Sequence, residues 1–175
     1  VITYYKSGFI FKELLLQFDI NILTTMLRVS LLRKTGLTFD SNITASEEYC
    51  LFMQLASQYK IGVLKDVLAK YRVHPNSLTS KSLLTLGKER KYTLDKIIGT
   101  NPVLLEKYKK EFKEAYARAN YYDSRWYMSK KEHMKAFKKL LPIAFVNPRY
   151  LILMFMTLLP SYVWNHVHIK RRNRT

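Results

Sequence analysis

The stretch Ser46-Glu47-Glu48-Tyr49-Cys50-Leu51-Phe52-Met53-Gln54-Leu55-Ala56 carries the clearest helix pattern in the first half of the chain. Serine is a preferred helix-capping residue, and the two glutamates after it lie in the first turn, where the helix dipole stabilises negative charge. Apolar residues then follow at helical spacing. A carboxylate in this position stays ionised and can accept a proton, so Glu47 and Glu48 are candidates for acid–base chemistry.

Shorter segments around this helix alternate between strand-like and helix-like patterns. Apolar residues in Phe9–Phe18 recur at helical spacing. A second, short helix is predicted at Ser30–Lys34, and Gly36 is a typical residue to end it. Runs of β-branched, aromatic or alternating residues predict strands at 1–5, 20–29, 60–63 and 67–73. Interleaved strands and helices predict an α/β fold class with an incomplete mixed sheet over residues 1–80.

Residues after Ser80 carry helical patterns only. Arg90 lies on the apolar face of the first predicted helix there, and Asn147-Pro148 begins the last element. We therefore expect an all-α tail after the α/β part. The predicted divisions are residues 1–80, a helical subdomain over 81–148 and an apolar, basic C-terminal segment over 149–175.

Four motifs between Thr24 and Ser80 occur in a fixed order. They are Thr25-Met26-Leu27-Arg28-Val29-Ser30-Leu31-Leu32, Gly36-Leu37-Thr38-Phe39-Asp40, the helix Ser46–Ala56, and Leu68-Ala69-Lys70-Tyr71-Arg72-Val73-His74-Pro75-Asn76-Ser77. Together they resemble the acceptor-side half of a family 2 glycosyltransferase with a GT-A fold. In that family a Gly-x-Phe-Asp loop precedes a helix that opens with Glu-Asp, and a strand ending Tyr-Arg-x-His-x-x-Ser follows.

The resemblance implies inverting transfer of a sugar from a nucleotide-diphosphate donor to the hydroxyl of a glycan or lipid-linked acceptor, in the synthesis of cell-envelope glycan or polysaccharide. It assigns the general base to Glu48, with Glu47 beside it, and places Asp40 and Gln54 on the acceptor side. Glutamate stands at the base position where the family has aspartate, and Gln54 stands where it has arginine.

Tyr71, Arg72 and His74 are the candidates for contact with the donor diphosphate. Arg72 and His74 are two residues apart on a predicted strand, so they point to the same side and can meet a diphosphate together. Two alternatives stay open: Arg72 as an ion-pair partner of Asp66 or Glu47, and His74 as a turn residue or a metal ligand.

The resemblance also implies a divalent metal, Mg²⁺ or Mn²⁺, for the complete enzyme, with His74 as a possible ligand. The Asp-x-Asp motif of the donor half is absent from this chain, and no Gly-rich phosphate loop is present. We therefore expect a piece of a longer enzyme that does not turn over a sugar nucleotide by itself.

Charge separates the two halves of the chain. The formal net charge of the 175 residues is +17, of which residues 1–80 contribute +3 and residues 81–175 contribute +14. The single cysteine, Cys50, excludes an internal disulfide and is expected to pack as a small core residue.

The apolar stretch Leu151–Trp164, with Tyr150, Tyr162 and Trp164 as interfacial aromatics, is followed by the basic cluster Lys170–Arg174. This order is typical of peripheral proteins on the anionic cytoplasmic face of a cell membrane, which is the predicted location. The alternative is that Leu151–Leu159 packs on the helical tail.

A non-catalytic basic helical module that binds anionic membrane or nucleic acid is the competing function. Acids alternate with bases along the predicted helices, as in Glu106-Lys107, and this pattern is typical of a solvated face. The sequence therefore favours a membrane over nucleic acid as the partner.

Overall fold

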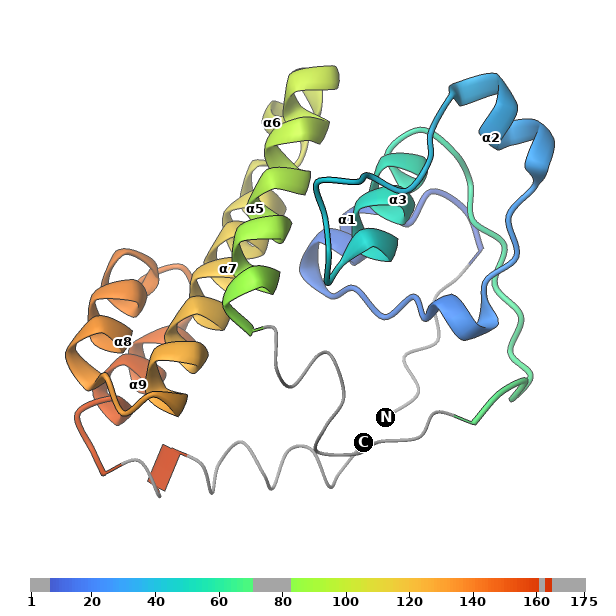
Figure 1. Ribbon diagram of the computed structural model, residues 1–175. Helices are drawn as coiled ribbons and strands as arrows, with labels where there is room; N and C mark the ends of the chain where they lie inside the picture. The colour runs from blue at the N-terminus through green and yellow to red at the C-terminus, as the bar shows by residue number, and fades with distance from the viewer. Residues whose placement is uncertain (1–6, 71–82, 161–162, 165–175) are drawn as a thin grey trace.

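The computed structural model describes residues 7–70, 83–160 and 163–164. The elements of this part are helical (Figure 1): α1 (Phe11–Leu16), η1 (Ile22–Thr24), α2 (Val29–Thr35), α3 (Glu47–Ala56), α5 (Leu83–Thr100), α6 (Val103–Lys107), α7 (Lys109–Ser129), α8 (His133–Leu140), η2 (Leu141–Ile143) and α9 (Pro148–Met156).

The predicted α/β class, with its partial GT-A sheet, is wrong for the described residues, which contain no strand. Their only β pairing is one antiparallel bridge, in which the backbone N–H groups of Gly8 and Ile61 each donate to the carbonyl of the other at 2.9 and 2.8 Å. A strand persists only where neighbours pair its backbone groups, and this bridge has none to extend it. The predicted strand at 20–29 instead contains η1 and the start of α2.

Helices α5 and α7 form the long axis of the molecule and lie side by side, with α6 between them in sequence (Figure 1). Gly87 allows this close approach, because a Cβ at that position would lie 2.9 Å from the carbonyl oxygen of Ala119 and would collide with the carboxylate of Asp123. Such contacts are shorter than packed side chains tolerate, so a residue without a side chain is required here.

Two main cores flank this axis. The first joins helices from both halves of the chain and includes Phe11, Leu14, Tyr49, Met53, Leu94 and Phe112. The second fills the space between the end of α7 and the α8–α9 hairpin, and it includes Tyr121, Met128, Leu140, Tyr150, Leu153 and Trp164. The first core fixes α3 against α5, and this contact positions the candidate site.

Candidate functional site

A buried carboxylate on α5 anchors the loop that leads into α3. Glu89, whose exposed fraction is 7%, accepts hydrogen bonds from the backbone N–H groups of Thr44 (2.6 Å) and Ala45 (3.1 Å). It also accepts from the hydroxyls of Thr44 (3.0 Å) and Ser46 (2.7 Å). The sequence position of Ser46 predicted that its side chain would cap α3. The side chain binds Glu89 of α5 instead.

The candidate base Glu48 lies half-buried in the first turn of α3. Burial raises the pKa of its carboxyl, and the nearby negative charges of Glu47 and Glu89 raise that pKa further. A backbone hydrogen bond and the positive charge of Arg90 act in the opposite direction. Glu48 therefore binds a proton more tightly than an ordinary glutamate, which is the property that a general base needs near neutral pH.

Glu47 lies beside the base with one oxygen, Oε2, buried and without a hydrogen-bond partner among the described residues. A buried carboxylate oxygen without a partner is costly, because it has lost its water without gaining a donor. The start of α3 thus combines two carboxylates in a partly desolvated setting.

Arg90 is the cation of this site, and the sequence interpretation did not assign it a role. Its guanidinium lies over the ring of Tyr49 at 4.4 Å and over that of Tyr122 at 5.0 Å, so α5 brings it between α3 and α7. An arginine on an otherwise apolar helix face was the signal that could have identified it. Its Nε is buried without a hydrogen-bond partner in the described part of the chain.

Asp40, expected on the acceptor side, forms an ion pair with α5. Its Oδ2 accepts from Lys96 Nζ at 2.6 Å and from the Tyr92 hydroxyl at 2.9 Å, while Oδ1 accepts from the Asn42 backbone N–H at 2.9 Å. These hydrogen bonds, led by that from Lys96, hold the pKa of the Asp40 carboxyl well below its usual range. The contacts give Asp40 a role in fastening the loop after α2 to α5.

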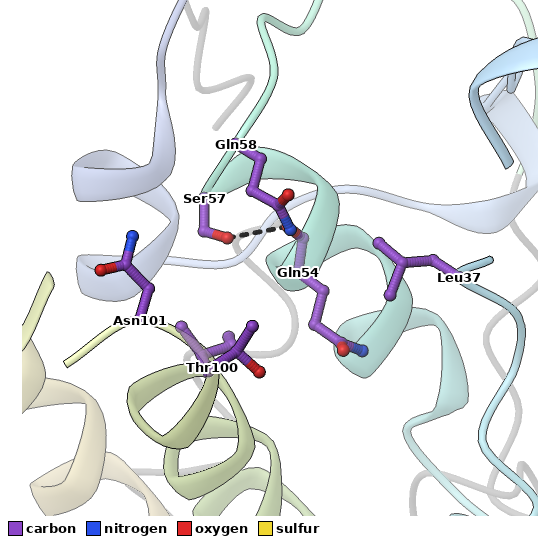
Figure 2. Close-up of a pocket in the computed structure, with 7 residues that line it drawn as sticks. Leu37, Gln54, Ser57, Gln58, Thr100 and Asn101 are labelled. Carbon is purple, nitrogen blue, oxygen red and sulfur yellow. Dashed lines mark hydrogen bonds between the residues drawn. The ribbon is translucent and has the colours of Figure 1, made fainter. Parts of the chain in front are cut away.

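Gln54, the other expected acceptor-side residue, lines a pocket of about 250 Å³ at the far end of α3. Its exposed fraction is 7%, and its amide nitrogen donates to the Cys50 carbonyl at 3.0 Å. Figure 2 shows Gln54 between Leu37 on one side and Thr100 and Asn101, at the end of α5, on the other. The full lining comprises Leu37, Gln54, Ser57, Gln58, Ile97, Thr100 and Asn101.

A second, wider depression lies on the other side of Leu37. It encloses about 420 Å³, and its walls are almost entirely apolar. Residues in and just before α2, in the loop after it and in α3 provide them. Its lining comprises Leu27, Leu32, Arg33, Gly36, Leu37, Thr38, Phe39 and Leu51.

Tyr71, Arg72 and His74, the predicted diphosphate contacts, lie outside the described residues, as does any metal ligation by His74. Within the described ranges, no three His, Cys, Asp or Glu side chains gather closely enough to hold a metal ion. The Mg²⁺ or Mn²⁺ site that the resemblance implies therefore stays a prediction.

Comparison of the chain with protein-family models, with curated proteins and with solved structures finds no match in any of the three. The assignment of a function therefore depends on the residues and contacts described above.

Proposed function

We propose that this chain forms the acceptor side of an inverting glycosyltransferase, with Glu48 as the general base and the pocket beside Gln54 holding one sugar of the acceptor. One observation carries the proposal: α3 bears a half-buried acid pair in its first turn and a neutral, polar pocket at its last. A base and an acceptor subsite on one rigid helix keep a fixed separation, as transfer chemistry requires.

The pocket has the chemistry that recognises a sugar. Three amides and two hydroxyls line it, together with Leu37 and Ile97, and none of its lining side chains is ionised. Amides and hydroxyls both donate and accept hydrogen bonds, as sugar hydroxyls do, and the apolar side chains suit the C–H faces of a ring. The volume equals that of about eight waters at roughly 30 Å³ each, which is enough for one sugar ring.

Glu48 would act on the hydroxyl that attacks the donor. Its carboxylate takes the hydroxyl proton while the oxygen forms a bond to the anomeric carbon of the donor sugar. The bond from that carbon to the diphosphate breaks on the opposite face, and the nucleoside diphosphate leaves with the electron pair. A pKa raised by burial strengthens the base, and the positive charge of Arg90 limits that rise.

The separation of Glu48 and Gln54 limits the acceptor. The two residues are six positions apart, which corresponds to about 9 Å along a helix axis. The reacting hydroxyl and the ring in the pocket would therefore belong to different sugars, so the proposal favours an acceptor longer than one sugar, free or lipid-linked.

The donor would be bound by residues that the structure does not describe. Tyr71, Arg72 and His74 are proposed to meet its diphosphate, and the metal would need ligands beyond the described residues. We propose a cytoplasmic location at the inner face of the cell membrane, which is supported by the apolar and basic composition of residues 149–175.

The test of this function is Glu48→Gln in the complete protein, assayed for transfer from UDP-glucose, UDP-galactose and UDP-N-acetylglucosamine. Loss of the base should lower kcat by about 100-fold or more, while the KM for the donor stays nearly unchanged. Glu106→Gln, at an exposed glutamate on α6, is the matched control and should transfer at the wild-type rate. Wild-type turnover by Glu48→Gln would remove Glu48 from this role.

A further inference from the structure

Helix α9 is apolar on two opposite faces, but only one of them is covered. Tyr150, Leu153 and Met154 are buried in the second core. Ile152 and Phe155, one turn apart on the outward face, keep exposed fractions of 62% and 57%. A helix that is apolar all round is normally buried on every side, so the outward face of α9 lacks a partner in the described structure.

Further exposed apolar side chains flank α9 at both ends in sequence. Phe145, just before the helix, is 89% exposed, and Leu158 and Leu159, just after it, are 56% and 45% exposed. These five side chains, with Ile152 and Phe155 at the centre, are called the α9 face below. Exposed apolar side chains that follow one another along a segment commonly mark a binding surface.

The sequence segment that contains α9 carries charged residues of a single sign. Residues 133–175 contain no aspartate or glutamate, and their eight cations are Lys135, Lys138, Lys139, Arg149, Lys170, Arg171, Arg172 and Arg174. Lys135 and Lys139 form ion pairs with Glu132 and Asp123, whereas Lys138 and Arg149 are exposed within the described part. An apolar helix face in a basic segment with exposed cations matches a surface that is apolar inside and anionic outside, as a bilayer with anionic headgroups is.

The two other candidate occupants fit less well. A second copy of this chain would add a second set of exposed cations, Lys138 and Arg149, to the same interface, and like charges at an interface oppose association. Nucleic acid would satisfy the cations but would leave the aliphatic Ile152, Leu158 and Leu159 without a function, since base stacking uses aromatic side chains.

The structure also changes the sequence prediction for this segment. Tyr150 and Trp164, expected as interfacial aromatics, are buried at exposed fractions of 1% and 3%, so neither is available to lipid. The alternative prediction was that Leu151–Leu159 packs on the helical tail. The structure shows this packing only for the inner face of α9, which includes Leu153 and Met154. No helix of the described ranges is both long enough and apolar enough to cross a bilayer.

From these observations we propose that the α9 face docks on an anionic phospholipid bilayer, with Ile152 and Phe155 inserted among the acyl chains and Lys138 and Arg149 against the headgroups. The helix lies in the plane of the membrane surface. This contact is independent of the sugar chemistry proposed above, because it uses none of the residues of α3 or α5.

The test is co-sedimentation of the full chain with two kinds of vesicle, pure phosphatidylcholine and an equal mixture of phosphatidylcholine with phosphatidylglycerol. The wild type should bind the anionic vesicles. The double variant Ile152→Ser/Phe155→Ser should bind them with an affinity at least about tenfold lower. Lys138→Glu/Arg149→Glu should also weaken binding, and this loss should be larger in low salt.

Met26→Ser/Val67→Ser is the matched control, because these side chains are 95% and 82% exposed and lie outside the α9 face. It should bind as the wild type does, and all variants should keep the wild-type circular dichroism and thermal midpoint. Three results would overturn the proposal: no binding of the wild type to anionic vesicles, unchanged binding of Ile152→Ser/Phe155→Ser, or a wild-type dimer that this variant dissociates. Failure here with intact transfer activity would leave the proposed sugar transfer standing and would remove the proposed location at the membrane.

Discussion

The carboxylate of Glu89 accepts a hydrogen bond of 2.7 Å from the hydroxyl of Ser46, and this contact joins α5 to the residue before α3 across 43 positions of sequence. The same carboxylate accepts from the backbone N–H groups of Thr44 and Ala45. The direction in which the first turn of α3 presents Glu47 and Glu48 therefore depends on one buried side chain of a different helix.

Glu89→Gln tests this dependence. The amide can turn only one oxygen toward four donors, and its own NH₂ group would face an N–H or O–H group. We expect the free energy of unfolding, measured in urea, to fall by about 1–3 kcal/mol. Glu106→Gln, at an exposed position, should change it by less than about 0.5 kcal/mol. Equal stability of the two variants would show that the carboxylate of Glu89 does not hold the loop.

Gly87 and Gly99 form a matched pair on α5. Alanine at Gly87 would overlap Asp123 and Ala119 of α7, so Gly87→Ala should lower the free energy of unfolding by about 1–3 kcal/mol. Alanine at Gly99 meets open space and adds helix propensity, so Gly99→Ala should raise it by up to about 1 kcal/mol. Thermal melts followed by circular dichroism would measure both. The same sign of change in both variants would contradict the packing of α5 on α7.

Asp40 should make the free energy of unfolding depend on pH in the acidic range. Its pKa is lower in the folded chain than its usual value of 3.8, because Lys96 and Tyr92 donate to its ionised form. Its contribution is therefore complete above the unfolded-state pKa and is lost as the pH falls through the folded-state value. Asp40→Asn should cost about 1 kcal/mol at pH 7 and progressively less below about pH 4. A cost that stays constant with pH would exclude the ion pair with Lys96 as its source.

The ionised carboxylate of Glu48 should affect the free energy of unfolding in the opposite direction from that of Asp40. Burial raises its pKa above the usual 4.5, so the folded chain binds the proton more tightly, and the ionised carboxylate destabilises the fold at neutral pH. Glu48→Gln should therefore raise the free energy of unfolding at pH 7, with no gain at pH 4. Glu13→Gln, in the exposed first turn of α1, should not stabilise the chain. A less stable Glu48→Gln variant would contradict the burial argument.

Local signals in the sequence predicted the helices and their ends better than the class of the fold. The pattern from Ser46 to Ala56 matches α3, Gly36 ends α2 with a left-handed φ of 68°, and Asn147 caps α9 by accepting from the backbone N–H of Arg149. Each of these depends on contacts within one or two turns of chain, which a sequence pattern records directly.

The predicted sheet and the buried contacts of the site depend on distant partners. The run at 20–29 is apolar, yet Leu23 and Met26 in it are 59% and 95% exposed, because apolar composition does not specify what will cover a segment. Glu89 and Arg90 likewise have no local pattern that ties them to α3, since their contacts with Ser46 and Tyr49 span more than 40 positions. Only the packing of α5 on α3 reveals these contacts.

The most direct test of the proposed function is whether the pocket at the end of α3 binds a sugar. Lactose, cellobiose and maltose, each titrated into the ¹⁵N-labelled chain at millimolar concentrations, provide neutral probes, and the side-chain amide signals of Gln54 and Asn101 report on the pocket. We predict saturable shifts of these two signals with at least one disaccharide, while the exposed amide of Asn21 stays unchanged. In Gln54→Leu the Asn101 signal remains as the reporter, and its shift should be lost. No saturable shift of Gln54 or Asn101 with any of the three sugars would contradict an acceptor subsite in this pocket.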